Sequence, residues 1–108
     1  MSTCIPLVLL VVHFVADFLL QSDWMAVNKS KRWDALALHV SIYAACFVWL
    51  GLAFVGVTWA THFLTDALTS RATSALWQRN QRHWFFAMIG FDQLIHAATL
   101  GATWQLLR

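Results

Sequence analysis

Three aspartates of this sequence lie inside apolar stretches, and each has a histidine four positions away. The pairs are His13 with Asp17, His62 with Asp66, and Asp92 with His96. Residues four apart lie on one face of an α-helix, so each pair would present an imidazole and a carboxylate together. Such mixed ligands suit zinc, manganese or iron, whereas carboxylates alone would favour magnesium or calcium. We therefore expect a divalent metal, with Zn or Mn ahead of Fe and Mg.

The order of the residues gives all three pairs the same polarity. If the first and third helices run one way and the last runs the other, the three aspartates lie in one layer. The histidines then lie in a second layer, about 6 Å deeper in the membrane. His39 falls at the depth of the histidine layer. The predicted metal ligands are His13, Asp17, His39, His62, Asp66, Asp92 and His96. Some of these aspartates could instead orient the histidines.

Further roles are assigned within and beside this set. Asp17 and Asp92 are the candidate general bases, since a carboxylate that is not held by the metal could take a proton from water. Gln21 and Gln93 adjoin the pairs and could bind a ligand or substrate, although structural hydrogen bonding is the favoured role. Lys29 is a candidate for holding an anionic headgroup or phosphate, with a role in membrane topology as the favoured alternative.

Other interpretations of these residues stay open. A single histidine inside a membrane is more often a hydrogen-bonded core residue than a ligand, and a single aspartate often joins helices or relays protons. A haem bound by two histidines would not require three carboxylates beside it. Three matched pairs of one polarity favour the metal site over these alternatives.

The composition indicates which elements must position these residues. The chain has 108 residues, of which 60% are hydrophobic and 11% are charged. An ordinary globular domain has about 45–50% and about 25%. A soluble domain of this size has too little interior to hide so much apolar surface, so we expect the lipid bilayer as its partner. The net charge of +2 is too small to suggest a nucleic-acid partner.

The apolar runs predict an all-α membrane bundle of four transmembrane helices with a His/Asp polar core, in a single domain spanning residues 1–108. The run 35–68 would measure roughly 51 Å as one helix, against a hydrocarbon core of about 30 Å. We therefore expect a turn near 49–53, at Gly51, with one steeply tilted helix as the alternative. The predicted helices span about 4–20, 35–50, 53–69 and 84–106.

The basic residues predict the orientation in the membrane. All Lys and Arg except Arg108 fall in two polar stretches, 29–32 and 71–82, which four helices would place on one side. The positive-inside rule makes that side cytoplasmic and leaves both termini outside. Trp24, Trp33, Trp77 and Trp84 flank these stretches, as expected at the lipid headgroups.

Several of these segments resemble a family of small bacterial and phage membrane proteins that is catalogued as a domain of unknown function. The segments are His13-Phe-Val-Ala-Asp17-Phe-Leu-Leu-Gln21, Lys29, His39, His62-Phe-Leu-Thr-Asp66 and Phe91-Asp92-Gln93-Leu-Ile-His96. That family is similar in style to inner-membrane metal-dependent hydrolases of bacteria, whose helical His and Asp residues are taken as metal ligands. The resemblance implies a multi-pass protein of the bacterial inner membrane and supports a metal site.

The leading hypothesis is a membrane-embedded, metal-dependent hydrolase that acts on a lipid or lipid-linked phosphate or ester. A bound metal could lower the pKa of a water molecule to about 7 and so supply a nucleophile. The first alternative is a proton or divalent-cation transport component, for which so small a chain would form a homo-oligomer. The second is a phage or bacterial accessory membrane protein without catalysis.

Overall fold

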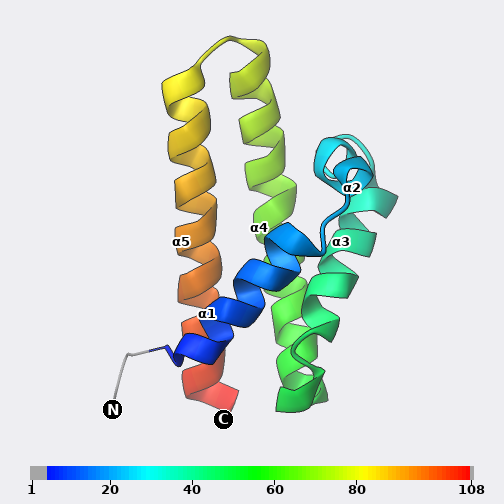
Figure 1. Ribbon diagram of the computed structural model, residues 1–108, viewed down its shortest axis with the longest axis vertical. Coiled ribbons are helices and arrows are strands. Elements are labelled where there is room, and N and C mark those ends of the chain that lie inside the picture. Colours follow the sequence, from blue (N-terminus) through cyan, green and yellow to red (C-terminus); the bar gives the residue numbers. More distant parts are fainter. Residues whose placement is uncertain (1–4, 108) are drawn as a thin grey trace.

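The structure is all-helical, which confirms the predicted fold class at this level. Figure 1 shows the computed structural model, which describes residues 5–107 and contains no strand within that range. The elements in chain order are α1 (Leu7–Phe14), a π-helical turn (Val15–Leu19), α2 (Asp23–Asn28), α3 (Trp33–Ala45), a 3-10 turn (Val48–Leu50), α4 (Leu52–Gln78) and α5 (Arg82–Leu107).

The two long helices, α4 and α5, form an antiparallel hairpin that makes up one side of the molecule (Figure 1). Helix α3 packs along α4, and α1 crosses the half of the hairpin that lies away from the α4–α5 turn (Figure 1). The chain reverses between α3 and α4 at Gly51, whose φ of 102° and ψ of 161° are accessible in practice only to glycine. This reversal lies within the region 49–53 where the sequence predicts a turn.

The helices differ from their predicted ranges mainly in the polar stretches. Helix α4 continues to Gln78, nine residues beyond its predicted end at 69, because residues 70–78 contain neither Gly nor Pro. The short helix α2 forms inside the predicted loop 21–34, where the Ser22 hydroxyl accepts a hydrogen bond from the Met25 amide at 3.2 Å. The predicted start of the first helix, at residue 4, and the ends of the domain 1–108 lie outside the described residues.

Polar side chains share the interior with apolar ones, while many large apolar side chains lie on the surface. The apolar core gathers around Tyr43, Phe47 and Phe54, with Leu9 and Leu100 beside them. Among the exposed residues are Leu52 and Leu106, each with 81% of its surface accessible. A soluble protein of this size rarely exposes so much apolar surface without a partner or a membrane to cover it.

Within the described residues, α5 is the one helix that is long and apolar enough to cross a membrane by itself, with 26 residues and a mean hydropathy of 1.2. The segment Leu7–Leu19 is apolar but shorter. Helix α4 is as long as α5 but carries more polar residues along its second half. The four predicted membrane crossings therefore stay a prediction.

Candidate metal centre

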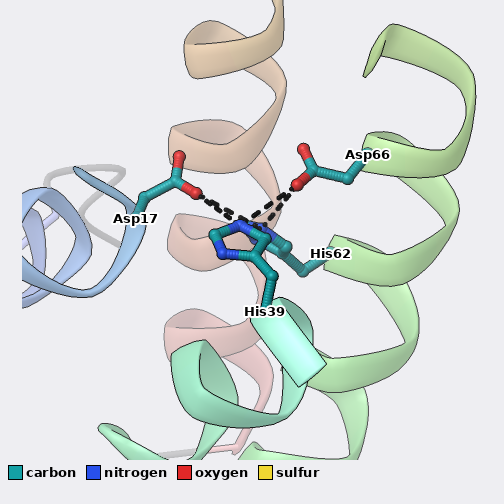
Figure 2. A group of neighbouring side chains, drawn as sticks. All are labelled: Asp17, His39, His62 and Asp66. Carbon is teal, nitrogen blue, oxygen red and sulfur yellow. Dashed lines mark hydrogen bonds and ion pairs between the residues drawn. The ribbon is translucent and has the colours of Figure 1, made fainter. Parts of the chain in front are cut away.

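Two histidines and two aspartates from three separate elements meet in the middle of the bundle. Asp17 comes from the π-helical turn, His39 from α3, and His62 and Asp66 from α4 (Figure 2). The Nε2 atom of His39 lies 3.0 Å from Asp17 Oδ1 and 3.2 Å from Asp66 Oδ2. The Nε2 atom of His62 lies 3.5 Å and 3.2 Å from the same two oxygens. We call these four residues the first ligand group.

Five of the six distances within the first ligand group match the edges of a tetrahedral metal site. The two Nε2 atoms of His39 and His62 lie 3.3 Å apart, so five of the six edges between the four ligand atoms measure 3.0–3.5 Å. A regular tetrahedron with zinc–ligand distances of about 2.0–2.1 Å has edges of about 3.3–3.4 Å.

A second group of ligands adjoins the first and shares Asp17 with it. Its other members are Asp92 and His96, both on α5. The Nε2 atom of His96 lies 3.2 Å from Asp92 Oδ1 and 3.1 Å from Asp66 Oδ1. The imidazoles of His96 and His62 are stacked, with ring centroids 4.0 Å apart. Both groups are buried, so the cluster could hold one or more metal ions away from bulk water.

The structure thus brings together six of the seven predicted metal ligands and places His13 outside both groups. The Nδ1 atom of His13 lies 2.6 Å from the Tyr43 hydroxyl, and its Nε2 atom lies 2.7 Å from Gln93 Oε1. In the other two pairs the histidine contacts its own aspartate, across one turn of regular α-helix. The π-helical turn explains the difference, because its wider winding changes the angle between His13 and Asp17.

Gln93 links His13 to the carboxylates of the cluster. Its Nε2 atom donates to Asp17 Oδ2 at 3.3 Å and to Asp92 Oδ2 at 3.1 Å. Because a carboxylate only accepts, this fixes the orientation of the Gln93 amide and makes its Oε1 the acceptor from His13 Nε2. His13 Nδ1 is then the acceptor from the Tyr43 hydroxyl. The sequence favoured structural hydrogen bonding over ligand binding for Gln93, and the structure places this side chain where it orients two carboxylates.

Tyr43 and Thr69 contact the site, although sequence reasoning gave neither a role there. The Tyr43 ring stacks on His62 with centroids 3.9 Å apart. Thr69 donates a hydrogen bond from its hydroxyl to Asp92 Oδ1. Their spacing could have indicated these contacts. Tyr43 follows His39 by four residues and Thr69 follows Asp66 by three, so each lies on the same helix face as a predicted ligand.

A cavity of about 190 Å³ opens beside the carboxylates of the cluster. Asp17, Asp66 and Asp92 line it, whereas the three clustered histidines do not. Lys29 lies at this cavity with its Nζ atom 3.5 Å from Asp66 Oδ2. Gln21 also lines the cavity, and its Oε1 atom is buried without a hydrogen-bond partner among the described residues. Water or a small anionic group could therefore reach the carboxylate side of the site.

One imidazole nitrogen of the first ligand group has no partner. His62 Nδ1 is buried and accepts or donates no hydrogen bond within residues 5–107, and the same is true of Thr58 Oγ1. Thr58 lies one turn before His62 on α4 and lines the small space beside it. A histidine that binds a metal through Nε2 carries its proton on Nδ1 and usually donates it to a nearby oxygen. Thr58, one turn away on the same face of α4, is the candidate acceptor for that proton.

These features define an all-helical protein with a buried His/Asp cluster that could hold a metal ion. The chain belongs to the family described as "Protein of unknown function (DUF3307)", which matches residues 5–108. The prediction of a family without an assigned function is confirmed. No curated protein and no solved structure matches the chain.

Proposed function

We propose that this protein is a membrane-embedded hydrolase that depends on a divalent metal ion and acts on a lipid or lipid-linked phosphate or ester. The observation that carries the proposal is the convergence of four ligand atoms in the first ligand group at tetrahedral spacing. Two nitrogens and two oxygens in this arrangement favour zinc, with manganese next.

The distribution of apolar and aromatic side chains supports four membrane crossings. Exposed leucines, phenylalanines and valines cover the outside of helices whose interior contains buried His and Asp side chains. At the end of the bundle that carries the basic stretches, the Arg71 guanidinium lies 4.0 Å from the centre of the Trp33 ring. Arg82 lies 3.5 Å above the ring of Trp77. Paired arginine and tryptophan side chains suit the headgroup level on the cytoplasmic side.

The carboxylate side of the cluster supplies what hydrolysis needs. A bound divalent ion would lower the pKa of a water molecule to about 7 and make it a nucleophile at neutral pH. Asp92 faces the cavity, where Thr69 and Gln93 fix the orientation of its carboxylate, and we assign it as the general base. The Lys29 ammonium at the same cavity would attract the phosphate or the developing negative charge of an ester.

The first experiment measures metal in the protein purified in detergent. We expect stoichiometric Zn or Mn, with loss of binding in His39→Gln and in Asp66→Asn. His83→Gln and Asp34→Asn change exposed residues of the same types and serve as controls that retain the metal. Protein that contains no metal, and that gains none when Zn or Mn is added at neutral pH, would contradict the proposal.

The second experiment tests hydrolysis by the metal-loaded protein. Phosphate release and lipid products are followed by mass spectrometry in vesicles of bacterial polar lipids, with nitrophenyl phosphate and nitrophenyl acetate as soluble probes. Loss of a general base lowers rates by about 10²–10⁴-fold, so Asp92→Asn should fall in that range while Asp34→Asn does not. Metal-loaded protein that yields no product from any of these substrates would end the hydrolase proposal and leave the metal site standing.

One observation favours transport as a second candidate. Thr58, Thr61, Thr99 and Thr103 continue the polar interior from His62 and His96 toward the other end of the bundle. These side chains leave no room for a water molecule among them, which suits a proton relay better than the passage of a hydrated cation. Proton flux in liposomes that disappears in Asp66→Asn, without any hydrolytic product, would favour this candidate.

A further inference from the structure

We propose that the cluster holds two divalent ions, bridged by the carboxylates of Asp17 and Asp66. This inference rests on the metal site of the proposed function and adds a second ion to it. The starting point is that two sets of ligand atoms overlap: Asp17 belongs both to the first ligand group and to the set with Asp92 and His96. Shared carboxylates are how proteins hold two ions about 3.5–4 Å apart.

The two oxygens of Asp66 point at different histidines. Oδ2 lies 3.2 Å from the Nε2 atoms of both His39 and His62. Oδ1 lies 3.1 Å from the Nε2 atom of His96. A carboxylate that bound a single ion would direct one or both of its oxygens toward the histidines of that ion alone. Asp66 instead directs one oxygen toward the histidines of the first ligand group and the other toward His96, as expected of a ligand that bridges two ions.

The two oxygens of Asp17 also have different partners. Its Oδ1 atom faces His39 at 3.0 Å, on the side of the first ligand group. Its Oδ2 atom accepts from Gln93 Nε2, and the same nitrogen donates to Asp92 Oδ2. One amide group thus holds the outer oxygens of Asp17 and Asp92 on the same side. His39 and His62 would complete the first ion. His96 and the Asp92 Oδ1 atom, 3.2 Å apart, would complete the second, and the Asp92 Oδ2 atom would stay free of metal to take the proton from water.

The cavity distinguishes the two positions. Each ion would have four protein ligands, but the two ligands that belong to the first ion alone are histidines, and neither of them lines the cavity. The second ion has Asp92 as one of its own ligands, and all three of its carboxylates line the cavity, so water could reach it there as a further ligand. Closed coordination is typical of structural sites and an open position of catalytic ones. The second ion is therefore the one that would activate water.

Charge balance identifies the class of substrate that a pair of ions favours. With neutral imidazoles, the three carboxylates and Lys29 leave an excess of two negative charges. One divalent ion neutralises that excess, and a second leaves two positive charges, which a hydroxide and a phosphate diester anion would balance. A paired centre thus favours a phosphate ester over a neutral carboxylic ester, because two ions can clamp the attacking and leaving oxygens.

The test is the number of ions bound by each chain. The detergent-purified protein is stripped with a chelator, dialysed to equilibrium against Mn²⁺, and analysed by mass spectrometry for metal and by amino-acid analysis for protein. We expect two ions per chain and an electron paramagnetic resonance spectrum of a coupled Mn²⁺ pair. His96→Gln and Asp92→Asn should each retain one ion, and the pair signal should be lost. His83→Gln, an exposed histidine at the start of α5, should retain two.

The outcomes separate the two proposals. Two ions in the native protein, reduced to one in either variant, support the paired centre. One ion in the native protein, with an uncoupled Mn²⁺ spectrum, refutes the paired centre and leaves the metal-dependent function intact. No bound ion refutes both. Because the native stoichiometry decides by itself, the test stands even if a variant fails to fold.

Discussion

Replacing Tyr43 by Phe tests whether the hydrogen bonds beneath the carboxylates stabilise the fold. The substitution removes the hydroxyl that donates to His13 Nδ1 at 2.6 Å and keeps the ring that stacks on His62. Tyr43 is 1% exposed and His13 is 7% exposed, so water cannot replace the lost donor. An unsatisfied buried acceptor costs about 1–3 kcal/mol. For a chain of this length, that corresponds to a fall in Tm of about 4–13 °C.

The assay is thermal unfolding of the metal-free protein in detergent, followed by circular dichroism at the helical bands. The same change in a His13→Leu background is the control, because the acceptor is already gone and the hydroxyl then has nothing to donate to. A fall in Tm of less than about 2 °C, or an equal fall in both backgrounds, would refute the hydrogen-bond chain through Tyr43, His13 and Gln93. The stoichiometry of bound metal should not change, because Tyr43 is not a ligand.

Three further substitutions test features around the site. Thr58→Val keeps the side-chain volume but removes the hydroxyl one turn before His62, the candidate acceptor for its Nδ1 proton. Zinc affinity measured by calorimetry should then fall about 10-fold or more, and unchanged affinity would show that this hydroxyl plays no part. Gly51→Ala should destabilise the protein by about 1–3 kcal/mol, because φ is 102° there. Gly56→Ala is its control, since both added methyl groups meet open space, and equal losses would disprove the backbone explanation. Arg32 donates to both oxygens of Asp34, and this lowers the pKa of that carboxyl below its ordinary value. Arg32→Gln should therefore raise the pKa toward the ordinary value in carbon NMR titration, and no change would show that the exposed pair does not persist in solution.

The sequence predicted the pairing of histidine and aspartate best where the helix is regular. His62 with Asp66 and Asp92 with His96 meet because a spacing of four returns to the same face of an α-helix. His13 and Asp17 have the same spacing, but the π-helical turn between them changes the angle at which they point. A π-turn has no clear sequence signature, so the position of His13 could not be read from the spacing alone.

The composition predicted which helices are present better than it predicted how long they are. The stretch after Thr69 is polar and was expected to be a loop, yet good helix formers such as Ala72 and Ala75 continue α4 to Gln78. The turn at Gly51 was predictable because glycine interrupts a run too long for one crossing. The roles of Tyr43 and Gln93 depend on how the helices are rotated about their axes, and apolar residues on every side leave that rotation undefined in the sequence.

The candidate ligands are spread along most of the chain, from Asp17 in the first apolar segment to His96 in the last helix. If the proposed metal centre forms, no nascent fragment that lacks α5 would contain both ligand sets, so complete metal loading would follow synthesis of the final helix. Metal capture would then be a late step in folding, because binding free energy is gained only by chains that have assembled every segment.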